Sequence, residues 1–340
     1  HHSVDNHLIH RSMYGCLPGK DSLVPAFIEE LQNEISRASR KSLVKFDNDA
    51  TSCYDRILAA IASITSRKFG LHKNVAFVMA RNLEDARYKL KTALGVSESF
   101  YKHCSLFPIY GTGQGSQNSP AIWCIISSVL FDCFETKAHG AKFESPDKSQ
   151  SITIFMVGFV DDSTGQVNQF IQNVQPSPES LLLIMRKDAQ LWNDLLWVSG
   201  GDLELPKCSY HLLHYMFTAD GAPILQGGQV GSDLILSSGD RTTTQKIPAL
   251  SAHTAHKTLG HFKDPAGNQI KQYKKLKVKS DKAGVFVQCS PLDGSEAWTY
   301  YFSIYLTSVG YALPNCFFLF QEARCNSKEG KSRHFCEMRI

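Results

Sequence analysis

The spacing of apolar positions changes from helical to alternating near the start of the chain. Apolar residues between Leu23 and Ile35 recur every three or four positions, which predicts an amphipathic helix over residues 22–40. Residues 42–48 then alternate between apolar and polar side chains, which predicts a strand that ends in acidic residues. The chain is therefore expected to begin with a helix that leads into a strand.

Helical and strand-like patterns continue to alternate along the rest of the chain. Helices are predicted over residues 56–69, 73–94, 120–137 and 177–198, half of a hairpin over 107–110, a β-hairpin over 152–164, and a loop or loose hairpin over 218–245. Gly70, Gly95 and Gly200 stand where three of the helical patterns stop, as glycine often does. This order predicts an α+β fold in which helices back an antiparallel sheet.

The composition is that of a globular protein and leaves several classes of partner open. Hydrophobic residues make up 43% of the 340 residues, charged residues make up 20%, and the formal net charge is +4, which permits a polyanionic partner without requiring one. No apolar run is long enough to span a membrane, and we recognise no signal peptide. We therefore expect an intracellular protein of the cytoplasm or nucleus, with no membrane partner.

Ten cysteines occur, but none of them forms a CxxC pair, so the usual spacing of a zinc site is absent. Free thiols in a reducing compartment are the expected state. The chain begins at His1 within polar sequence and ends in a polar stretch, and from this we expect a fragment of a larger protein.

The first segment with candidate chemistry follows the predicted strand 42–48. Asp47, Asn48 and Asp49 stand at the end of this strand and lead through a turn into a helix. An acid at such a strand tip can hold a cation. The alternative is that these side chains cap the next helix, and taken alone capping is the better interpretation.

The second segment is rich in glycine and runs from Gly111 to Pro120. A glycine-rich loop that enters a helix lets the backbone approach a phosphate or a base closely. The alternative is a flexible turn before a helix that Ser119 and Pro120 begin. The two interpretations carry equal weight at this point.

The third segment contains two adjacent acids, Asp161 and Asp162, between two apolar strands of the predicted hairpin. Neighbouring carboxylates repel each other and raise each other's pKa unless a cation neutralises them. The alternative is that Asp-Asp simply forms the turn. A binding role for the pair becomes more attractive when the three segments are considered together.

Taken together, the three segments point to phosphoryl transfer. A two-metal mechanism needs carboxylates from separate strands that converge on cations roughly 3.5–4 Å apart. Carboxylates without histidine or cysteine favour Mg²⁺ or Mn²⁺ over zinc. The order of acid, glycine-rich loop and Asp-Asp hairpin therefore predicts a metal-dependent phosphoryl-transfer site.

With these segments in view, the chain resembles reverse transcriptases, in particular those of non-LTR retrotransposons and group II introns. The resemblance covers about residues 14–262 and lies in Tyr14–Gly19 (the stretch before motif A), Asp49–Asp55 (motif A), Gln114–Pro120 (motif B, QGxxxSP), Phe159–Asp162 (motif C), Leu203–Cys208 (motif D) and Lys257–Gly260 (motif E). It implies an RNA-directed DNA polymerase of a retroelement. The implied fold is a right-hand polymerase palm with partial fingers and thumb.

The resemblance also implies roles for individual residues. Asp49, Asp161 and Asp162, with the carbonyl of Ala50, would bind two Mg²⁺ or Mn²⁺ ions, and Lys207 would protonate the leaving pyrophosphate. The implied partners are an RNA template, a DNA or RNA primer, deoxynucleotides and further domains of the same retroelement polyprotein.

The nucleotide and template would be held by a second group of residues. Tyr54 would stack under the incoming sugar and exclude a 2′-hydroxyl, although it could equally be a core aromatic at a helix start. Gln114, Gly115, Ser116 and Phe159 would line the nucleotide and template pocket.

The implied organisation has partial fingers over residues 1–45, a palm over 46–217, a connection with the motif E hairpin over 218–262, and the start of a thumb or C-terminal extension over 263–340. Within the last segment, a lysine run either contacts nucleic-acid phosphates or forms a solvated face: Lys271, Lys274, Lys275 and Lys277.

Two other functions compete with reverse transcription. An RNA-templated RNA polymerase usually has Gly before Asp-Asp and an acid where Tyr54 stands, whereas this chain has Val160 and an aromatic ring. The second competitor is a truncated, inactive remnant that binds RNA or DNA. It is favoured by the missing upstream fingers sequence, which would carry basic triphosphate contacts.

Overall fold

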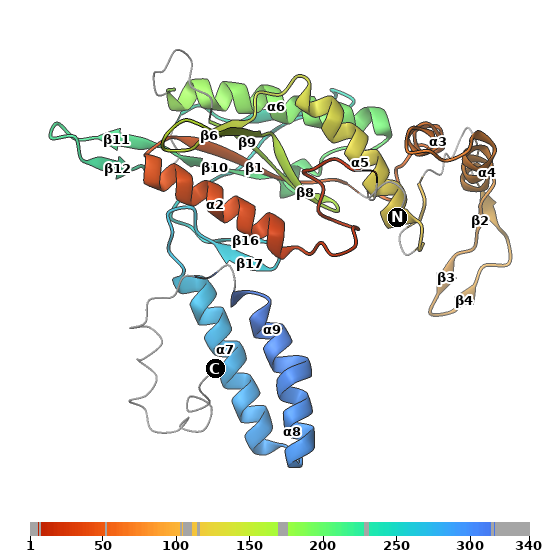
Figure 1. Ribbon diagram of the computed structural model, residues 1–340. Coiled ribbons are helices and arrows are strands. Elements are labelled where there is room, and N and C mark those ends of the chain that lie inside the picture. Colours follow the sequence, from red (N-terminus) through yellow and green to blue (C-terminus); the bar gives the residue numbers. More distant parts are fainter. Residues whose placement is uncertain are drawn as a thin grey trace.

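The computed structural model describes most of the chain (Figure 1). The described residues are 6, 8–51, 53–102, 104, 111–113, 116–168, 176–227, 231–313 and 316. The predicted half-hairpin at 107–110 lies outside them.

A mixed sheet of five strands forms the centre of the molecule, in the order β15-β10-β1-β9-β8. All neighbours are antiparallel except β15, which runs parallel to β10. The strands are β1 (Leu43–Asp49), β8 (Met156–Phe159), β9 (Asp162–Val167), β10 (Ser209–Leu213) and β15 (Ala249–Leu250). The predicted α+β class is confirmed, and so is the strand that ends in acid.

The two faces of the sheet differ in polarity because successive side chains of a strand point to opposite faces. Val44 and Phe46 of β1 are fully buried on one face, where Trp192 also donates a hydrogen bond to Asn48. Lys45 and Asp47 point to the other face. The apolar face therefore carries the core, and the polar face is available for a site.

Two long helices cover the apolar face (Figure 1). They are α5 (Ser119–Glu135), which has Pro120 in its first turn, and α6 (Pro178–Ser199), which ends at Gly200 in the left-handed conformation. Their aromatic and aliphatic side chains form one continuous core with the sheet. Both helices confirm the predictions to within two residues.

Helix α2 (Leu23–Ser39) lies on the polar face, and its orientation contradicts the amphipathic pattern. Phe27 and Leu31 of the predicted core-facing stripe are 47% and 46% exposed, whereas Glu29 is buried. The reason is the polarity of the surface beneath: α2 turns its polar side toward the buried Lys45 and Thr164 of the sheet.

The second helical correction concerns residues 73–94. Helix α4 (Lys73–Glu84) follows α3 (Ala59–Lys68), but it ends ten residues earlier than predicted. The sequence then alternates in β fashion, and residues 87–102 form an antiparallel ribbon. Its strands are β2 (Arg87–Tyr88), β3 (Lys91–Thr92), β4 (Gly95–Val96) and β5 (Tyr101–Lys102).

Further strands pair in short hairpins outside the central sheet. Two of these hairpins fall in the region predicted as a loop or loose hairpin. The paired strands are β6 (Ala141–Glu144) with β7 (Ser151–Ile154), β11 (Tyr215–Phe217) with β12 (Pro223–Leu225), β13 (Ile235–Ser237) with β14 (Thr244–Lys246), and β16 (His256–Thr258) with β17 (His261–Lys263). A single 3₁₀ turn, η1 (Leu205–Lys207), precedes β10.

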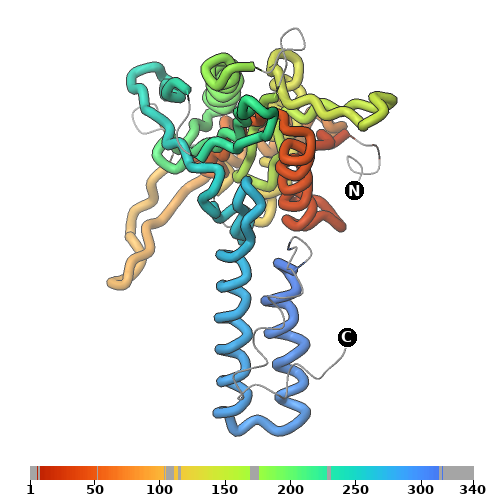
Figure 2. Tube along the Cα trace, turned by 90° about the vertical axis from the view of Figure 1, so that its left-hand side faces the viewer, coloured from red at the N-terminus to blue at the C-terminus, as the bar shows by residue number. Residues whose placement is uncertain are grey.

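A helical hairpin projects from the sheet below β16 and β17, as Figures 1 and 2 both show. It consists of α7 (Ile270–Cys289), α8 (Gly294–Tyr300), the π-helical turn η2 (Tyr301–Tyr305) and α9 (Leu306–Gly310). Asp293 and Glu296 form a reciprocal capping box at the start of α8. This cap stabilises the point where the chain reverses direction after α7. In the part of the chain that the structure describes, no helix is long and apolar enough to cross a membrane.

Candidate active site

The ends of β1 and β9 bring two carboxylates together on the polar face of the sheet. Asp49 closes β1 and lies directly opposite Asp162, the first residue of β9. Phe159 pairs with Asp162 across the hairpin, so Val160 and Asp161 form the two-residue turn. The predicted turn at Asp161-Asp162 is therefore shifted by one residue, and Asp162 belongs to the strand.

Val160 holds the tip in an unusual backbone conformation, with φ at 62°. A β-branched residue rarely adopts positive φ, so neighbouring contacts must hold it there. Trp123 Nε1 donates a 2.7 Å hydrogen bond to the Val160 carbonyl. On the other side, a Cβ atom at Gly15 would lie only 2.4 Å from Val160 N, so glycine is required for this close approach. The turn that carries Asp161 is thus fixed from two sides.

Lys207 reaches the first carboxylate from η1. Its Nζ lies 3.0 Å from Asp49 Oδ2, and the amide of Glu204 donates to the Asp49 carbonyl at 2.9 Å. The hydrogen bond and charge of Asp49 raise the pKa of Lys207 above its usual value. The segment Leu203–Cys208, singled out in the sequence, therefore packs against the acidic strand end.

Loss of hydration and nearby negative charge both act on the Asp162 carboxylate at the tip of the sheet. Loss of hydration inside the cleft is the largest contribution to the raised pKa of Asp162, which reaches about 6 although part of the side chain is exposed. The charges of Asp161 and Asp49 raise it further. A cation at this position would relieve the repulsion, because opposite charge stabilises the ionised carboxylate.

The donor set suits a hard divalent cation, since it consists of oxygen atoms. Within the described ranges, however, no group of three or more histidine, cysteine, aspartate or glutamate side chains is arranged to hold an ion. The structure places Asp49, Asp161 and Asp162 at one end of the sheet, and the Asp49 carboxylate contacts Lys207 rather than the other two acids.

The turn after Asp49 packs against the glycine-rich loop. The Thr112 amide donates to the Tyr54 carbonyl at 2.8 Å, and a Cβ atom at Gly111 would lie 2.3 Å from the backbone of Asp55. Burial is the largest cause that raises the pKa of Tyr54 to about 12. Tyr54 is half-buried and packs against the main hydrophobic core.

Three further residues were predicted to line the nucleotide pocket, and the structure describes only one of them, Ser116. Gln114 and Gly115 lie outside the described residues. Ser116 is exposed, and its amide donates to the Gly113 carbonyl. Ser119 is buried and donates its hydroxyl to the same carbonyl at 2.9 Å, which anchors the loop to the start of α5.

A cleft of about 240 Å³ opens on the polar face beside these residues. Its floor comes from the strand ends, and its walls come from α2 and the β16–β17 hairpin. The lining residues include Pro25, Glu29, Asp47, Asp49, Phe159, Asp162, Lys207, Lys257, Thr258 and Leu259. The predicted Lys257–Gly260 segment thus faces the carboxylates.

Sequence reasoning missed Glu29, and it did not predict that Asp47 is largely buried. Glu29 is buried and forms an ion pair with Lys263 of β17, with 2.7 Å between the charged atoms. Asp47 is only 17% exposed and accepts from Thr164; burial opposes its ionisation, but the hydrogen bond from His211 lowers its pKa to about 2. An acid within a helical apolar pattern was the only signal in the sequence for Glu29.

Two of the four α7 lysines that were candidates for phosphate contact bind the β16–β17 hairpin instead. Lys271 Nζ donates to the Ala255 carbonyl, Lys275 Nζ donates to the Gly260 carbonyl, and both lie within 5.0 Å of the Phe262 ring centre. The other two, Lys274 and Lys277, are exposed.

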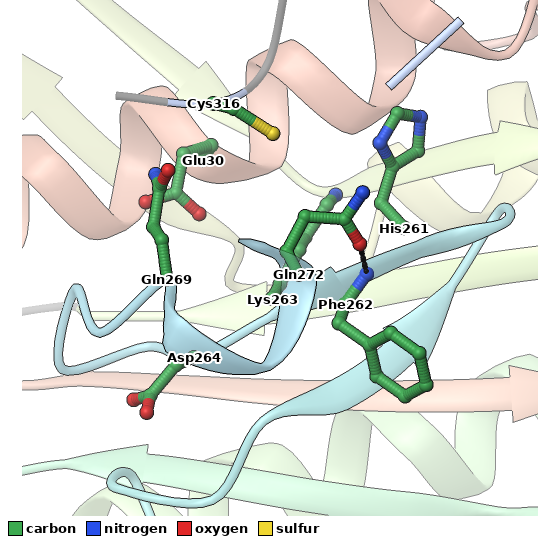
Figure 3. A pocket seen from close by; sticks show the side chains of 8 residues that line it. All are labelled: Glu30, His261, Phe262, Lys263, Asp264, Gln269, Gln272 and Cys316. Carbon is green, nitrogen blue, oxygen red and sulfur yellow. Dashed lines mark hydrogen bonds between the residues drawn. The ribbon is translucent and has the colours of Figure 1, made fainter. Parts of the chain in front are cut away.

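A second, much smaller cavity lies where α7 meets the hairpin (Figure 3). Its volume of about 10 Å³ suits a single water molecule. Gln272 Oε1 accepts from the Phe262 amide at 2.9 Å beside it. Burial lowers the pKa of His261, which lines this cavity, to about 4. The cavity belongs to the joint between two elements and lies outside the carboxylate cleft.

No protein-family model matches the chain. No curated protein matches it either. Among solved structures, it is similar to telomerase from Candida tropicalis in complex with a TWJ fragment of telomeric RNA, with 16% identity, a TM-score of 0.40, and coverage of 59% of this chain and 30% of that one. Apo telomerase from Candida tropicalis, truncated from the C-terminal domain, gives 12% identity and a TM-score of 0.40 over 69% and 41% of the two chains.

Telomerase from Candida albicans in complex with the same kind of RNA fragment gives 13% identity and a TM-score of 0.43 over 90% of this chain and 49% of that one. The chain therefore spans less than half the length of each of these telomerase structures.

Proposed function

We propose that this chain is an RNA-directed DNA polymerase of a retroelement, which adds deoxynucleotides to a primer 3′-hydroxyl on an RNA template. The observation that carries the proposal is the opposition of Asp49 and Asp162 at the strand ends, with Asp161 in the adjoining turn and Lys207 at 3.0 Å from Asp49. Crowding like charges beside a cleft costs stability, so a function that uses them is the better explanation.

The carboxylate end of the sheet fits two Mg²⁺ or Mn²⁺ ions by the chemistry of its donors. Asp49, Asp161 and Asp162, with the carbonyl of Ala50, would hold the ions. When bound, such ions lower the pKa of a hydroxyl nucleophile and neutralise charge on a triphosphate. The raised pKa of Asp162 supports this fit, because its burial and the charges of its neighbours disfavour ionisation without a counter-ion.

Lys207 would donate a proton to the leaving pyrophosphate. Its ammonium group lies at the cleft wall, and a lysine with an ordinary pKa is protonated near neutral pH. When the Asp49 carboxylate takes up a cation, Lys207 would lose its ion-pair partner and could turn toward the triphosphate.

Tyr54 and Phe159 would position the incoming nucleotide. Tyr54 is tied through its carbonyl to the glycine-rich loop, which would keep its ring in place under the sugar. Phe159 lines the cleft next to Asp162. Gln114, Gly115 and Ser116 would complete the nucleotide and template pocket, and exposed Lys274 and Lys277 of α7 would contact the duplex backbone.

The second candidate function is an inactive remnant that binds RNA or DNA without copying it. The observation that favours it is that, within the described ranges, no group of three or more histidine, cysteine, aspartate or glutamate side chains is arranged to hold an ion. In this case the acidic cleft would be inherited from an active ancestor.

Primer extension separates these functions. The chain is incubated with Mg²⁺ and a primer annealed to an RNA template, supplied either with deoxynucleotides or with ribonucleotides. Extension with deoxynucleotides supports the proposal. Extension only with ribonucleotides indicates an RNA polymerase. A folded chain that binds primer–template but extends with neither substrate supports the remnant.

A further inference from the structure

The antiparallel ribbon formed by residues 87–102 projects from the end of α4 and pairs only with itself among the described strands. Figures 1 and 2 both show it reaching away from α6, on the same side of the central sheet as the α7–α9 hairpin. Leu94 at its tip is fully exposed. A two-stranded ribbon without a core is marginal by itself, so its sequence is free to serve a surface function.

The ribbon carries a concentration of positive charge. It contains four basic side chains and one acid, Glu98; the basic residues are Arg87, Lys89, Lys91 and Lys102. Arg87 lies directly opposite Lys102 in the strand register. Like charges at directly opposed positions destabilise a β-ribbon, so an anion bound between the two side chains would stabilise it.

No ion pair within the described part of the chain neutralises these four residues. Arg87 and Lys102 are directly opposed and therefore point to the same side of the ribbon. Lys89 and Lys91 follow Arg87 along the same arm, so this arm is the more basic of the two.

Aromatic rings accompany this charge. Phe100 and Tyr101 are 59% and 52% exposed, so both rings are accessible to a partner. Lys89 Nζ lies 4.7 Å from the centre of the Phe100 ring, so a cation and an aromatic face occur at the same place. Tyr88 and Tyr101 are directly opposed at the next position, so they point to the side opposite Arg87 and Lys102, where their rings stack with centres 5.5 Å apart.

We propose that the ribbon of residues 87–102 binds single-stranded RNA through its basic side chains and its exposed aromatic rings. Arg and Lys side chains contact backbone phosphates, and exposed rings stack on bases that are not paired. A phosphate between Arg87 and Lys102 would remove the repulsion between them. Paired bases are stacked inside a duplex and cannot reach Phe100 or Tyr101, so the surface is selective for single strands.

This binding site goes beyond the proposed polymerase function, because it uses none of the cleft carboxylates. It is tested in the Asp161→Ala background, without Mg²⁺ or nucleotides, by the fluorescence anisotropy of a labelled 20-nucleotide unstructured RNA. Loss of polymerisation and loss of ribbon binding are then separate results.

The test variant changes the four basic ribbon residues to glutamine. Its matched control removes one arginine and three lysines elsewhere, at exposed positions in α6, in β6 and after α5: Arg186, Lys187, Lys137 and Lys142. We expect the ribbon variant to bind at least tenfold more weakly. Its plot of log affinity against log salt should flatten by about 0.7 per lost phosphate contact. The control should stay within twofold of the parent, and equal weakening in the two variants would overturn the proposal.

A second variant tests the stacking. Phe100→Ala with Tyr101→Ala should weaken binding of the single strand severalfold without changing the salt dependence, because no charge is lost. Binding of a 20-base-pair RNA duplex should be unaffected. An equal loss for duplex and single strand, or no loss for either, would overturn the stacking role.

Discussion

Asp49 and Asp162 lie directly opposite each other on neighbouring antiparallel strands, Asp49 as the last residue of β1 and Asp162 as the first residue of β9. Directly opposed residues point to the same face of a sheet, so the two carboxylates share the polar face above the cleft. The same register places Asp161 in the turn beside them. Carboxylates arranged in this way can hold a cation between them. The central claim is therefore that the chain catalyses a cation-dependent reaction.

Replacement of Lys207 should separate catalysis from stability. We expect Lys207→Ala to slow single-nucleotide addition by about 100-fold if the ammonium acts as general acid. The thermal unfolding midpoint should stay the same, because the side chain is exposed and surface ion pairs contribute little. Lys246→Ala is the control, since Lys246 forms a comparable exposed ion pair, with Asp233 at 2.8 Å. A fast Lys207→Ala enzyme would remove the general-acid role.

Tyr54 should control the choice of sugar. We expect Tyr54→Val to raise incorporation of ribonucleotides relative to deoxynucleotides by at least about tenfold, because the smaller side chain leaves room for a 2′-hydroxyl. Tyr54→Phe keeps the ring and should preserve discrimination. The comparison is made from kcat/KM for both nucleotides in each variant. Unchanged discrimination in Tyr54→Val would contradict the steric role.

The buried ion pair between Glu29 and Lys263 should join α2 to the β16–β17 hairpin. We expect Glu29→Met alone or Lys263→Met alone to lower the free energy of unfolding by about 3–5 kcal/mol, because each leaves a buried charge without its partner. The double variant should recover most of this loss. Urea unfolding of the four proteins measures the coupling, and strictly additive losses would show that the pair is not coupled.

His261 should make stability sensitive to mild acid. Burial lowers its folded-state pKa to about 4, whereas the unfolded value is about 6.5. The neutral ring therefore stabilises the fold fully above pH 6.5, and this contribution is lost as the pH falls from about 6.5 toward 4, up to about 3 kcal/mol. His261→Phe keeps a ring against Tyr311 and should lose less stability between pH 7 and pH 4.5 in urea unfolding. Equal losses would contradict this role.

The sequence predicted the elements that carry the core. The elements β1, α5 and α6 bury apolar faces against one another. The spacing of their apolar residues along the sequence therefore matches the positions that are buried in the fold. The acidic strand ends were also recognisable, because they occur in order with a glycine-rich loop between them, although each segment alone has a structural explanation. The resemblance then supplied the roles of Asp49, Asp161 and Asp162.

The remaining features depend on contacts between distant segments. Helix α2 exposes Phe27 and buries Glu29 because the sheet beneath it is polar. The sequence of residues 22–40 alone does not indicate whether the surface on which the helix packs is polar or apolar. The end of α4 at Glu84 was missed because residues 73–94 contain good helix formers, while the alternation that begins at Arg87 favours a ribbon.

The central claim is tested most directly by primer extension on an RNA template with Mg²⁺ and deoxynucleotides, comparing the parent with Asp161→Ala. Asp240→Ala is the control, because Asp240 is an exposed turn carboxylate that caps its own loop. We predict extension by the parent and the control, and none by a folded Asp161→Ala chain. Undiminished extension by Asp161→Ala would contradict the account.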